Sequence, residues 1–548
     1  MRVTIIFLLT LFSSFSFAQT KYWIFFKDKD LKNYNYTKHL SPKTIENRKR
    51  FGLELAQYSD VPITVSYIKS ISQFGVELVS KSKWLNGISA ELTDQEVLKV
   101  RTLPFVKSIE KINTSIRITS TYLDPTPKAT ALALAQMQSE LFLQKGITGK
   151  GVDIGVVDAG FHKANDDRFL KHLFTENRIK QQCDFLDPLR TDIIDDNKTE
   201  GDYHGRIVLD MLAGYDSGDD VQSGMAPNGN YFLARTEDGA HEYRGEEDKW
   251  MEAMEWLDSL GVRLISTSLG YAIKMDEPKD NYEKEDMNGK TTRISKAANI
   301  AINEKGIFLV VSAGNEGSNE SWTIISSPAD VEGALSVGAT RDFIWDKIGY
   351  SSIGPDFLPY LKPNVSCFSP NGTSFSAPAV AGFVACLMEM DSTLSNRQLK
   401  SIMEKSSHLY PYGNNYIGYG IPRASRAIKL LVDSTYKFDN TKEIHVQGDT
   451  FKVSDQNRNL KGGVLFHKKN ATIVVKQDQL KPLDAQQLDL YLKAQDTGKK
   501  MSKRKRKKLI EQRAKLENKQ EVITIVRPPN VKRSTLAING EVLEIFWD

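Results

Sequence analysis

The sequence is poor in cysteine, because its 548 residues include only Cys183, Cys367 and Cys386. So few cysteines exclude a disulfide-rich scaffold, and an odd number allows one disulfide at most, with one thiol left over. Cys386 lies within the apolar run 380–387, where a small buried side chain is favoured over a disulfide partner. An excess of charge is also missing, since 73 Lys and Arg stand against 69 Asp and Glu, for a net charge of +4. That balance excludes few classes of protein.

Long hydrophobic runs are scarce as well. One covers residues 3–12, about half of the roughly 20 residues that cross a bilayer. Met1 and Arg2 give it a basic start, and small residues accompany the stretch up to Ala18. This pattern predicts a secretory signal peptide over 1–18, cut near Ala18. We therefore expect an exported protein, secreted or periplasmic, with no transmembrane segment.

The composition, with 40% apolar and 26% charged residues, is typical of a folded protein and excludes collagen-like or wholly disordered chains. At roughly 100–200 residues per domain, the length predicts about two to four domains. We expect an α+β unit over 19–111, a linker over 112–135 and a large domain over 136–432. From 433 to 548, short strands predict a small β-rich domain, which a polar helical stretch over 483–519 interrupts.

In the large domain, strand-like segments alternate with helical ones. Apolar, β-branched segments lie at 152–157, 231–234, 263–268, 307–312 and 334–338, and helix-like segments lie between them at 205–214, 247–260 and 291–305. This alternation is typical of a mostly parallel α/β sheet with helices on both faces. Such sheets place their active sites beyond the carboxyl ends of the strands.

Two titratable residues lie at such places. Asp158 ends the strand 152–157, where a carboxylate can accept a hydrogen bond from an imidazole and stabilise the imidazolium. An aspartate that caps a turn is the plainer alternative, and for Asp158 alone it is favoured. His204 precedes Gly205 and a run of apolar residues at helical spacing, which predicts an imidazole at a helix N-terminus. A lone histidine is usually unremarkable, so the argument depends on the whole set.

A serine and an asparagine complete the set. Ser374 precedes the small-residue stretch 377–382, which predicts a helix N-terminus whose free backbone N–H groups favour developing negative charge. Pro378, near the first turn, would cost such a helix little. An ordinary N-cap serine is the alternative, but the small residues keep the approach to the hydroxyl open. Asn315 follows the strand 307–311, and its amide could donate to an oxyanion.

The chain order Asp158, His204, Asn315, Ser374 resembles that of the subtilisin-like serine peptidases. The segments 224–227 (Gly-Met-Ala-Pro) and 268–270 (Ser-Leu-Gly) add to the resemblance, which covers roughly residues 140–432. Residues 19–111 resemble the inhibitory propeptide of this family, mainly at 84–93 and 103–106. An α/β-hydrolase is disfavoured, because the sequence around the serine is not G-x-S-x-G and the chain order differs.

The resemblance implies a subtilisin-like fold and hydrolysis of protein or peptide substrates through an acyl-enzyme on Ser374. His204 would act as general base and then acid, Asp158 would orient it, and Asn315 would form the oxyanion hole with the Ser374 backbone N–H. The implied substrate-binding residues are Ser268, Leu269, Gly270, Gly314 and Glu316. The chain would be a zymogen that its own propeptide inhibits, and it would require no cofactor. Glu316 predicts a modest preference for substrates that are not acidic just before the scissile bond.

Three features depart from the family pattern. Arg206 stands where a small hydroxyl residue is usual, and we expect it to crowd His204. Ala159 replaces a hydroxyl residue beside Asp158, which removes one hydrogen bond. Only six residues separate Val365 from Gly372, where relatives commonly have a longer loop. These departures leave open a catalytically inactive binding or scaffold protein with the same fold, although the complete set of four residues favours an enzyme.

Two charged features have plainer alternatives. Acidic loops could bind structural Ca²⁺, but solvated loops are favoured because no fixed ligand spacing is present. They contain Asp192, Asp195, Asp196, Asp216, Asp219, Asp220 and residues 276–286. Residues 491–520 hold twelve Lys and Arg against three Asp and Glu, so this segment is +9 and the remainder −5. It could touch nucleic acid, anionic lipid or cell-wall polymers, yet a solvated helix is favoured and nucleic-acid binding is not expected.

Overall fold

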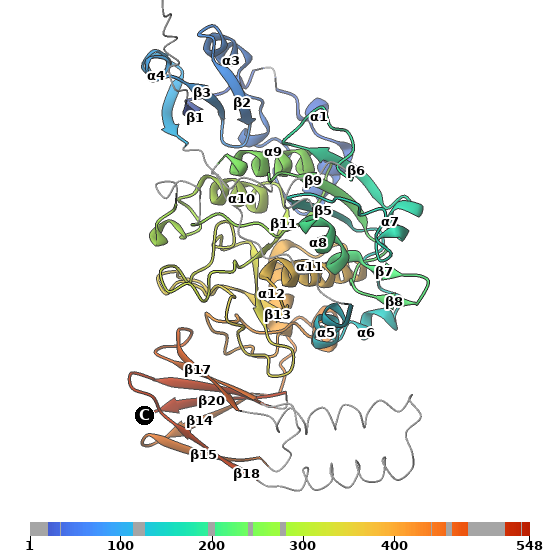
Figure 1. Ribbon diagram of the computed structural model, residues 1–548, viewed down its shortest axis with the longest axis vertical. Helices are drawn as coiled ribbons and strands as arrows, with labels where there is room; N and C mark the ends of the chain where they lie inside the picture. The colour runs from blue at the N-terminus through green and yellow to red at the C-terminus, as the bar shows by residue number, and fades with distance from the viewer. Residues whose placement is uncertain are drawn as a thin grey trace, which may run out of the picture.

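The computed structural model describes residues 20–32, 34–112, 127–194, 203–238, 245–273, 281–439, 441–455, 463–480, 521–538 and 540–548. Figure 1 shows three units along the long axis, with the N-terminal sheet at one end, the α/β unit in the middle and the C-terminal sheet at the other end. The predicted signal peptide over 1–18 and the predicted helical stretch over 483–519 lie outside the described residues.

The N-terminal unit is a four-stranded antiparallel sheet with helices. Its strands follow the order β2-β3-β1-β4 and are β1 (Thr20–Phe26), β2 (Glu77–Ser82), β3 (Gly87–Leu92) and β4 (Val106–Lys111). Its helices are α1 (Tyr36–His39), α2 (Pro42–Arg50), the 3₁₀ turn η1 (Tyr58–Asp60), α3 (Val65–Ser72) and α4 (Asp94–Arg101). At the start of α4, Thr93 and Glu96 form a capping box, which satisfies backbone N–H groups at the helix N-terminus.

The middle unit has a seven-stranded sheet in the order β13-β12-β11-β10-β5-β9-β6, and every neighbouring pair is parallel. The strands are β5 (Asp153–Asp158), β6 (Ile179–Asp184), β9 (Asn230–Arg235), β10 (Leu264–Thr267), β11 (Phe308–Ser312), β12 (Leu335–Thr340) and β13 (Val365–Phe368). The predicted α/β class with a parallel sheet is therefore confirmed. The outer strands β6 and β13 were not predicted, because β6 is polar and β13 is a short strand between two prolines, Pro363 and Pro370.

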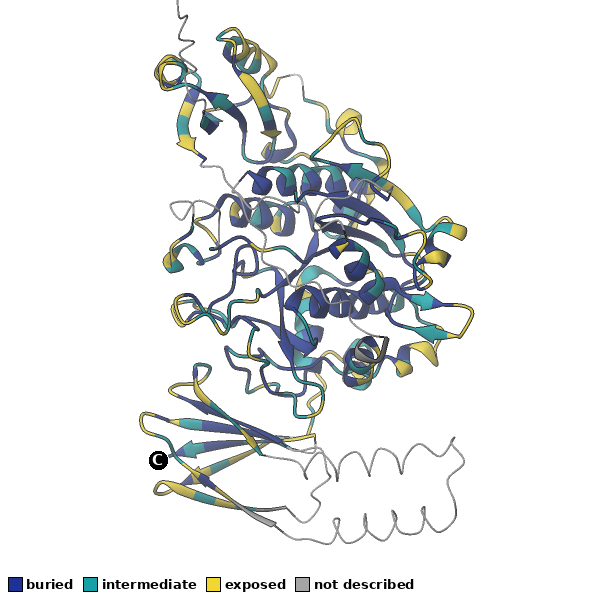
Figure 2. Cartoon of the chain, viewed as in Figure 1, coloured by how far each residue is buried: buried dark blue, intermediate teal, exposed yellow. Residues whose placement is uncertain are grey.

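Helices cover both faces of this sheet, as Figures 1 and 2 show. One face packs against α8 (His204–Ala213) and α11 (Thr373–Met390), and the other against α9 (Glu246–Ser259) and α10 (Arg293–Asn303). Within the described part of the chain, α11 alone is long and apolar enough to cross a membrane, but 89% of it is buried in the protein. Burial on this scale identifies α11 as the central core helix of the unit.

Smaller elements complete the middle unit. They are α6 (Glu140–Leu143), α7 (Lys171–Thr175), α12 (Asn396–Ser406), α13 (Ala424–Val432), the turn η3 (Lys284–Asp286) and the hairpin of β7 (Tyr215–Asp216) and β8 (Val221–Gln222). All three cysteines are free, and Cys367 and Cys386 are buried.

The predicted linker over 112–135 needs a correction at its C-terminal end. Residues Pro127–Met137 form helix α5, in which Ala133, Leu134 and Met137 are buried in the core of the middle unit. Prolines are common in linkers, but a proline at the first helical position costs a helix little, and the residues after Pro127 are mostly Ala and Leu. The rest of the predicted linker, 113–126, lies outside the described residues.

The C-terminal unit is β-rich. A five-stranded sheet follows the order β14-β20-β19-β16-β17, and β15 pairs with β18. The strands are β14 (Thr441–Val446), β15 (Thr450–Asp455), β16 (Gly463–Lys468), β17 (Val474–Leu480), β18 (Glu521–Val526), β19 (Arg533–Ile538) and β20 (Glu541–Trp547). The sheet is tied to the middle unit where the backbone N–H of Val474 donates to Asn415 Oδ1 at 2.9 Å and that of Lys347 donates to Gln477 Oε1 at 2.9 Å.

The N-terminal sheet rests on one face of α9, which Figure 1 shows beneath β2. Asp248 accepts a hydrogen bond from Trp23 Nε1 at 2.6 Å and pairs with Lys21 at 2.8 Å. One and two turns further along, Glu252 and Glu255 accept from the hydroxyls of Ser80 and Ser82 at 2.5 and 2.6 Å. Positions four and seven residues apart share a helix face, so α9 offers a row of carboxylates to the sheet.

A second contact lies around the segment 41–60. Asp60 accepts from Arg48 Nη2 at 2.9 Å and from Lys305 Nζ at 2.7 Å, and all three side chains are fully buried. Burial alone would raise the pKa of Asp60, but these two cations hold the pKa at about 2. Since Lys305 follows α10, this ion cluster joins the N-terminal unit to the middle unit.

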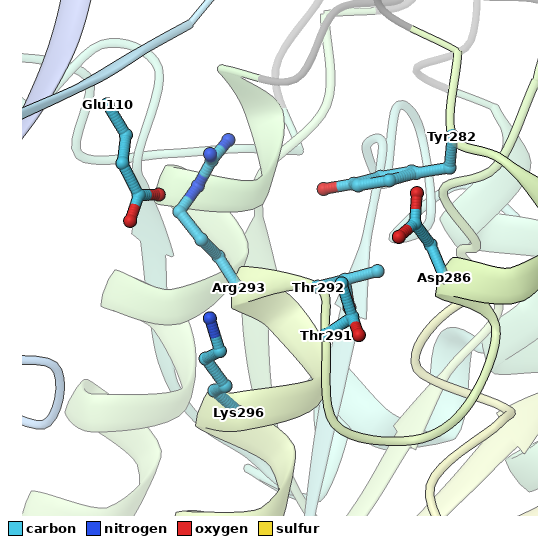
Figure 3. Close-up of a pocket in the computed structure, with 7 residues that line it drawn as sticks. All are labelled: Glu110, Tyr282, Asp286, Thr291, Thr292, Arg293 and Lys296. Atoms are coloured by element: carbon cyan, nitrogen blue, oxygen red, sulfur yellow. The ribbon is translucent and has the colours of Figure 1, made fainter.

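A pocket of about 200 Å³ lies where β4 approaches the start of α10, and Figure 3 shows its lining side chains. They are Glu110, Tyr282, Asp286, Thr291, Thr292, Arg293 and Lys296. Glu110 comes from β4, whereas Arg293 and Lys296 come from the first turns of α10. The carboxylate of the N-terminal unit thus faces cations at a helix N-terminus, an electrostatically favourable arrangement.

Candidate active site

Asp158 and His204 meet beyond the carboxyl ends of the parallel strands. Asp158 is the last residue of β5, His204 is the first residue of α8, and Nδ1 of the imidazole lies 2.6 Å from Oδ1 of the carboxylate. The backbone N–H of Ala159 also donates to this Oδ1, at 2.8 Å. Gly205 explains the close approach, since a Cβ there would lie 2.4 Å from the carbonyl oxygen of Gly160. A larger residue would push α8 away from β5.

The pKa of His204 is raised. Burial alone would lower it, because the imidazole is almost completely enclosed, but the charge of Asp158 and the hydrogen bond to it outweigh that effect. The pair therefore favours the imidazolium form of His204. A histidine that takes up a proton during a reaction needs such a neighbour.

Ser374 lies in the first turn of α11 and is 8% exposed. Its hydroxyl donates to the carbonyl of Ser268 at 3.3 Å, and the hydroxyl of Ser268 donates to the carbonyl of Ser374 at 2.7 Å. The next residue, Phe375, places its ring 5.6 Å from the His204 ring. The start of α11 thus lies beside His204 and beside the segment that follows β10.

Pro378 has a different role from the one we predicted. Because α11 begins at Thr373, Pro378 lies beyond the first turn, and its missing N–H would normally donate to the carbonyl of Ser374 four residues earlier. The hydroxyl of Ser268 supplies this donor instead. Pro378 therefore leaves the carbonyl of Ser374 without its helical donor, and Ser268, in the segment after β10, binds this carbonyl.

Asn315 lies three residues after β11 and is exposed. Its Oδ1 accepts from the backbone N–H of Thr373 at 2.8 Å and from the Thr373 hydroxyl at 3.0 Å. Since Oδ1 carries both contacts, the amide is oriented with Nδ2 on its other side. Gly314, at φ 106°, provides the left-handed backbone that this turn requires. An amide donor is thus fixed next to the helix that carries Ser374.

The predicted substrate-binding residues fall on two segments beyond β10 and β11. Ser268 is buried, Leu269 is half-buried and Gly270 is exposed. A Cβ on Gly270 would lie 2.1 Å from the hydroxyl oxygen and 3.0 Å from the Cβ of Ser326, so the side chain of Ser326 packs closely against Gly270. Glu316 is half-buried, and Oε2 of its carboxylate accepts from Asn319 Nδ2 at 2.8 Å.

The structure bears on two of the three departures from the family pattern. The guanidinium of Arg206 pairs with Asp167 at 3.0 Å and lies over the ring of Tyr203, 5.7 Å from its centroid. Asp167 and Tyr203 are therefore two neighbours of Arg206, and the crowding of His204 stays a prediction. Beside Ala159, by contrast, Oδ2 of Asp158 is buried and has no hydrogen-bond partner in the described part of the chain. This agrees with the loss of one hydrogen bond there.

One residue of this region was missed from the sequence. Glu237 follows β9 and is 6% exposed, and its carboxylate accepts a hydrogen bond from Tyr271, the residue after Gly270. The sequence signal for Glu237 was its place directly beyond a strand. In the structure this strand lies next to the one that ends at Asp158. The burial of Glu237 is not evident from the sequence, because a charged run after a strand is usually a solvated loop.

Within the described ranges, no group of three or more His, Cys, Asp or Glu side chains lies close enough to hold a metal ion. Asp216 and Asp219, from one of the acidic loops, lie 3.4 and 3.5 Å from the guanidinium of Arg168. Asp195, Asp196 and residues 276–280 lie outside the described residues.

A parallel sheet with an Asp–His pair and a serine at a helix start beyond its strands is the arrangement of serine peptidases with an α/β fold. The sequence profile of the subtilase family (Peptidase S8) matches residues 149–420, and that of the Peptidase S8 propeptide domain of Bacteroidota matches residues 21–126. The chain belongs to the subtilase family, and it is a serine-type peptidase preceded by a propeptide domain.

Relatives and solved structures agree with this assignment. Subtilisin NAT of Bacillus subtilis subsp. natto and subtilisin E of Bacillus subtilis (strain 168) are each 25% identical over 362 residues, 64% of this chain and 83% of theirs. The epidermin leader peptide processing serine protease of Staphylococcus aureus has a TM-score of 0.52 at 15% identity, over 77% of this chain and 100% of that one. Fervidolysin of Fervidobacterium pennivorans, a keratinolytic enzyme, has a TM-score of 0.50 at 16% identity, over 84% and 68%. Each of these two structures is similar to this chain in fold.

Proposed function

We propose that this protein is an exported serine endopeptidase, made as a zymogen, which hydrolyses peptide bonds through an acyl-enzyme on Ser374. The single observation that carries the proposal is the buried 2.6 Å contact between His204 and Asp158 beside the helix that bears Ser374. A nucleophile, a base and a carboxylate that orients the base are the three parts that acyl transfer of this kind needs.

In this mechanism His204 takes the proton of the Ser374 hydroxyl as Oγ attacks the scissile carbonyl. The imidazolium that forms is stabilised by Asp158, and it then passes its proton to the leaving amine. Water enters, His204 accepts a proton from it, and the ester to Ser374 is hydrolysed. The raised pKa of His204 supports this role, because the enclosed site favours the protonated imidazole in the intermediate steps.

Asn315 serves as one donor of the oxyanion hole, and the backbone N–H of Ser374 serves as the other. The orientation of the Asn315 amide by Thr373 supports this assignment, since a donor fixed in advance costs no reorganisation during the reaction. Ser268, Leu269, Gly270, Gly314 and Glu316 form the walls along which the substrate chain binds. No cofactor takes part in these steps.

The domain boundaries follow as proposals. We assign 1–18 to a signal peptide for export, 19–111 to the inhibitory propeptide and 433–548 to a C-terminal β-rich domain. The peptidase domain extends to 432, and the burial of α5 moves its proposed start from 136 to 127. The row of carboxylates on α9 and the ion cluster at Asp60 support a propeptide that binds its own peptidase tightly.

A fluorophosphonate probe tests the proposal directly, because it forms a covalent bond only with an activated serine. We expect the wild-type chain, once its propeptide has been cut off, to carry the label on the peptide that contains Ser374. The uncut chain should label slowly. If the separated peptidase unit remains folded but is neither labelled nor active on a denatured protein, the alternative of an inactive scaffold holds.

Glu316 leads to a prediction about specificity. We expect substrates with an acidic residue just before the scissile bond to be cleaved more slowly, because a carboxylate at the rim of the cleft repels them. Glu316→Gln should reduce this bias by about two- to fivefold, the size of an interaction between partly exposed charges. Cleavage of a peptide library measures the effect, with Glu320→Gln as the matched control. A library profile that favours acidic residues at this position would contradict the prediction.

A further inference from the structure

Two buried carboxyl groups lie beside the candidate active site. Oε1 of Glu237 accepts from the hydroxyl of Tyr271 at 2.6 Å and from that of Thr236 at 3.0 Å. Glu246, the first residue of α9, is 1% exposed, and its Oε1 accepts from the backbone N–H of Asp238 at 2.9 Å. Side chains this deeply buried and hydrogen-bonded are held in one position.

The backbone places Glu237 between the two halves of the site. In the β5–β9 pairing, Asp158 stands opposite Arg235, and its carbonyl accepts from the N–H of Thr236 at 3.0 Å. Tyr271 is the residue after the segment 268–270, and its backbone pairs with Ser327 through hydrogen bonds of 2.8 and 3.1 Å. The hydrogen bond from Tyr271 to Glu237 therefore links the end of the substrate segment to the strand next to Asp158.

Glu237 is surrounded by acids and hydroxyl groups. Asp158 acts on it through its negative charge, Glu246, Tyr271 and Thr236 are its hydrogen-bond partners, and His204 is the group that can become a cation. Arg235 turns to Asp184, at 3.1 Å, and to the carbonyl of Ala159, at 3.1 Å. Burial, with a smaller contribution from the charge of Asp158, raises the pKa of Glu237 to about 7 against the effect of its hydrogen bonds. The charge of Glu237 in turn raises the pKa of His204.

We propose that Glu237 is a positioning residue of the peptidase reaction, which anchors Tyr271 at the end of the substrate segment and stabilises the imidazolium of His204 by its negative charge. The inference rests on the function proposed above. Glu237 touches neither the substrate nor the scissile bond, and it acts through His204 and Tyr271. Because the pKa of Glu237 is about 7, the pH profile of the enzyme should depend on this carboxyl group as well as on His204.

Glu237→Gln tests the electrostatic part. The amide cannot become negative, so the pKa of His204 should fall, and the acidic limb of the kcat/KM profile should move to lower pH by about half a unit to one unit. Tyr271→Phe should move the limb in the same direction. Without the phenol's hydrogen bond, the pKa of Glu237 rises further and less negative charge is present at neutral pH. Tyr271→Phe should also raise KM, because the substrate segment loses an anchor.

Tyr282→Phe is the matched control, because the hydroxyl of Tyr282 donates to another buried glutamate, Glu247, at 2.5 Å. It should leave the acidic limb and KM as in the wild type. Limbs of Glu237→Gln and Tyr271→Phe that coincide with the wild-type limb would overturn the proposal, even if both variants have a changed KM. If Glu237→Gln does not fold, the limb of Tyr271→Phe decides.

A readout without catalysis separates this inference from the proposed function. In the full chain with Ser374→Ala, NMR of labelled histidine follows the protonation of His204 directly. Adding Tyr271→Phe or Glu237→Gln should lower the His204 pKa, whereas an unchanged pKa would overturn the inference. A wild-type protein without activity that depends on Ser374 would overturn the proposed function instead.

Discussion

Ser374→Ala is expected to leave the chain uncut between β4 and α5 and to reduce the hydrolysis of a denatured protein by at least about a thousandfold. Alanine cannot form the ester on which both reactions depend, and water at the same place is a weaker and less well-positioned nucleophile. The substitution removes one oxygen atom from the first turn of α11, so the fold should persist. Denaturing gels follow the processing, and release of labelled peptides from the substrate follows the hydrolysis.

Ser376→Ala is the matched control for this experiment. Ser376 lies on the same helix, is fully buried and donates to the carbonyl of Thr373 at 3.0 Å. Its loss should cost some stability but leave processing and hydrolysis nearly unchanged. If Ser374→Ala cuts itself and its substrate like the wild type, the proposed acyl-enzyme is wrong and any activity comes from elsewhere.

The sequence predicted the strands that carry the site better than those at the edges of the sheet, for a physical reason. Central strands such as β5 and β11 are buried on both faces and read as continuous apolar runs. Strand β6 is partly exposed and contains Lys180, Gln181 and Gln182, so its composition resembles that of a loop. Residues 63–71 include several β-branched side chains, which are common in strands, yet 65–72 form helix α3, whose apolar residues pack against the N-terminal sheet.

The candidate site was predictable where each residue follows a strand or begins a helix, as Asp158, His204 and Ser374 do. The structure adds what depends on contacts between distant segments. The hydroxyl of Ser268 replaces the N–H that Pro378 lacks, and no local pattern could show this. The burial of Glu237 was equally hidden, because it is set by Tyr271, which lies 34 residues further along the chain. Local patterns therefore located the parts, and tertiary contacts determined how they are held.

Asp158→Asn should reduce kcat at neutral pH by about 10⁴-fold, the order of loss expected when the orienting carboxylate of a Ser/His/Asp triad becomes an amide. Two effects act together. The amide can donate to Nδ1 of His204, which turns the imidazole into the tautomer that cannot accept the serine proton at its other nitrogen. It also removes the negative charge that raises the pKa of His204, so the imidazolium intermediate is less stable. Because Asp158 is fully buried and the amide is nearly isosteric, the fold should be kept.

Asp167→Asn is the control, since Asp167 pairs with Arg206 near the same helix but outside the set of reacting residues. It should change kcat by less than about threefold, as expected for a partly exposed ion pair. The two variants are compared as full pH profiles of kcat, each on chains whose propeptide has been removed. An Asp158→Asn profile equal to that of Asp167→Asn would mean that the 2.6 Å contact with His204 serves the fold alone. A large loss confined to Asp158→Asn would instead place the carboxylate in the proton transfer, because only that variant changes the tautomer of His204.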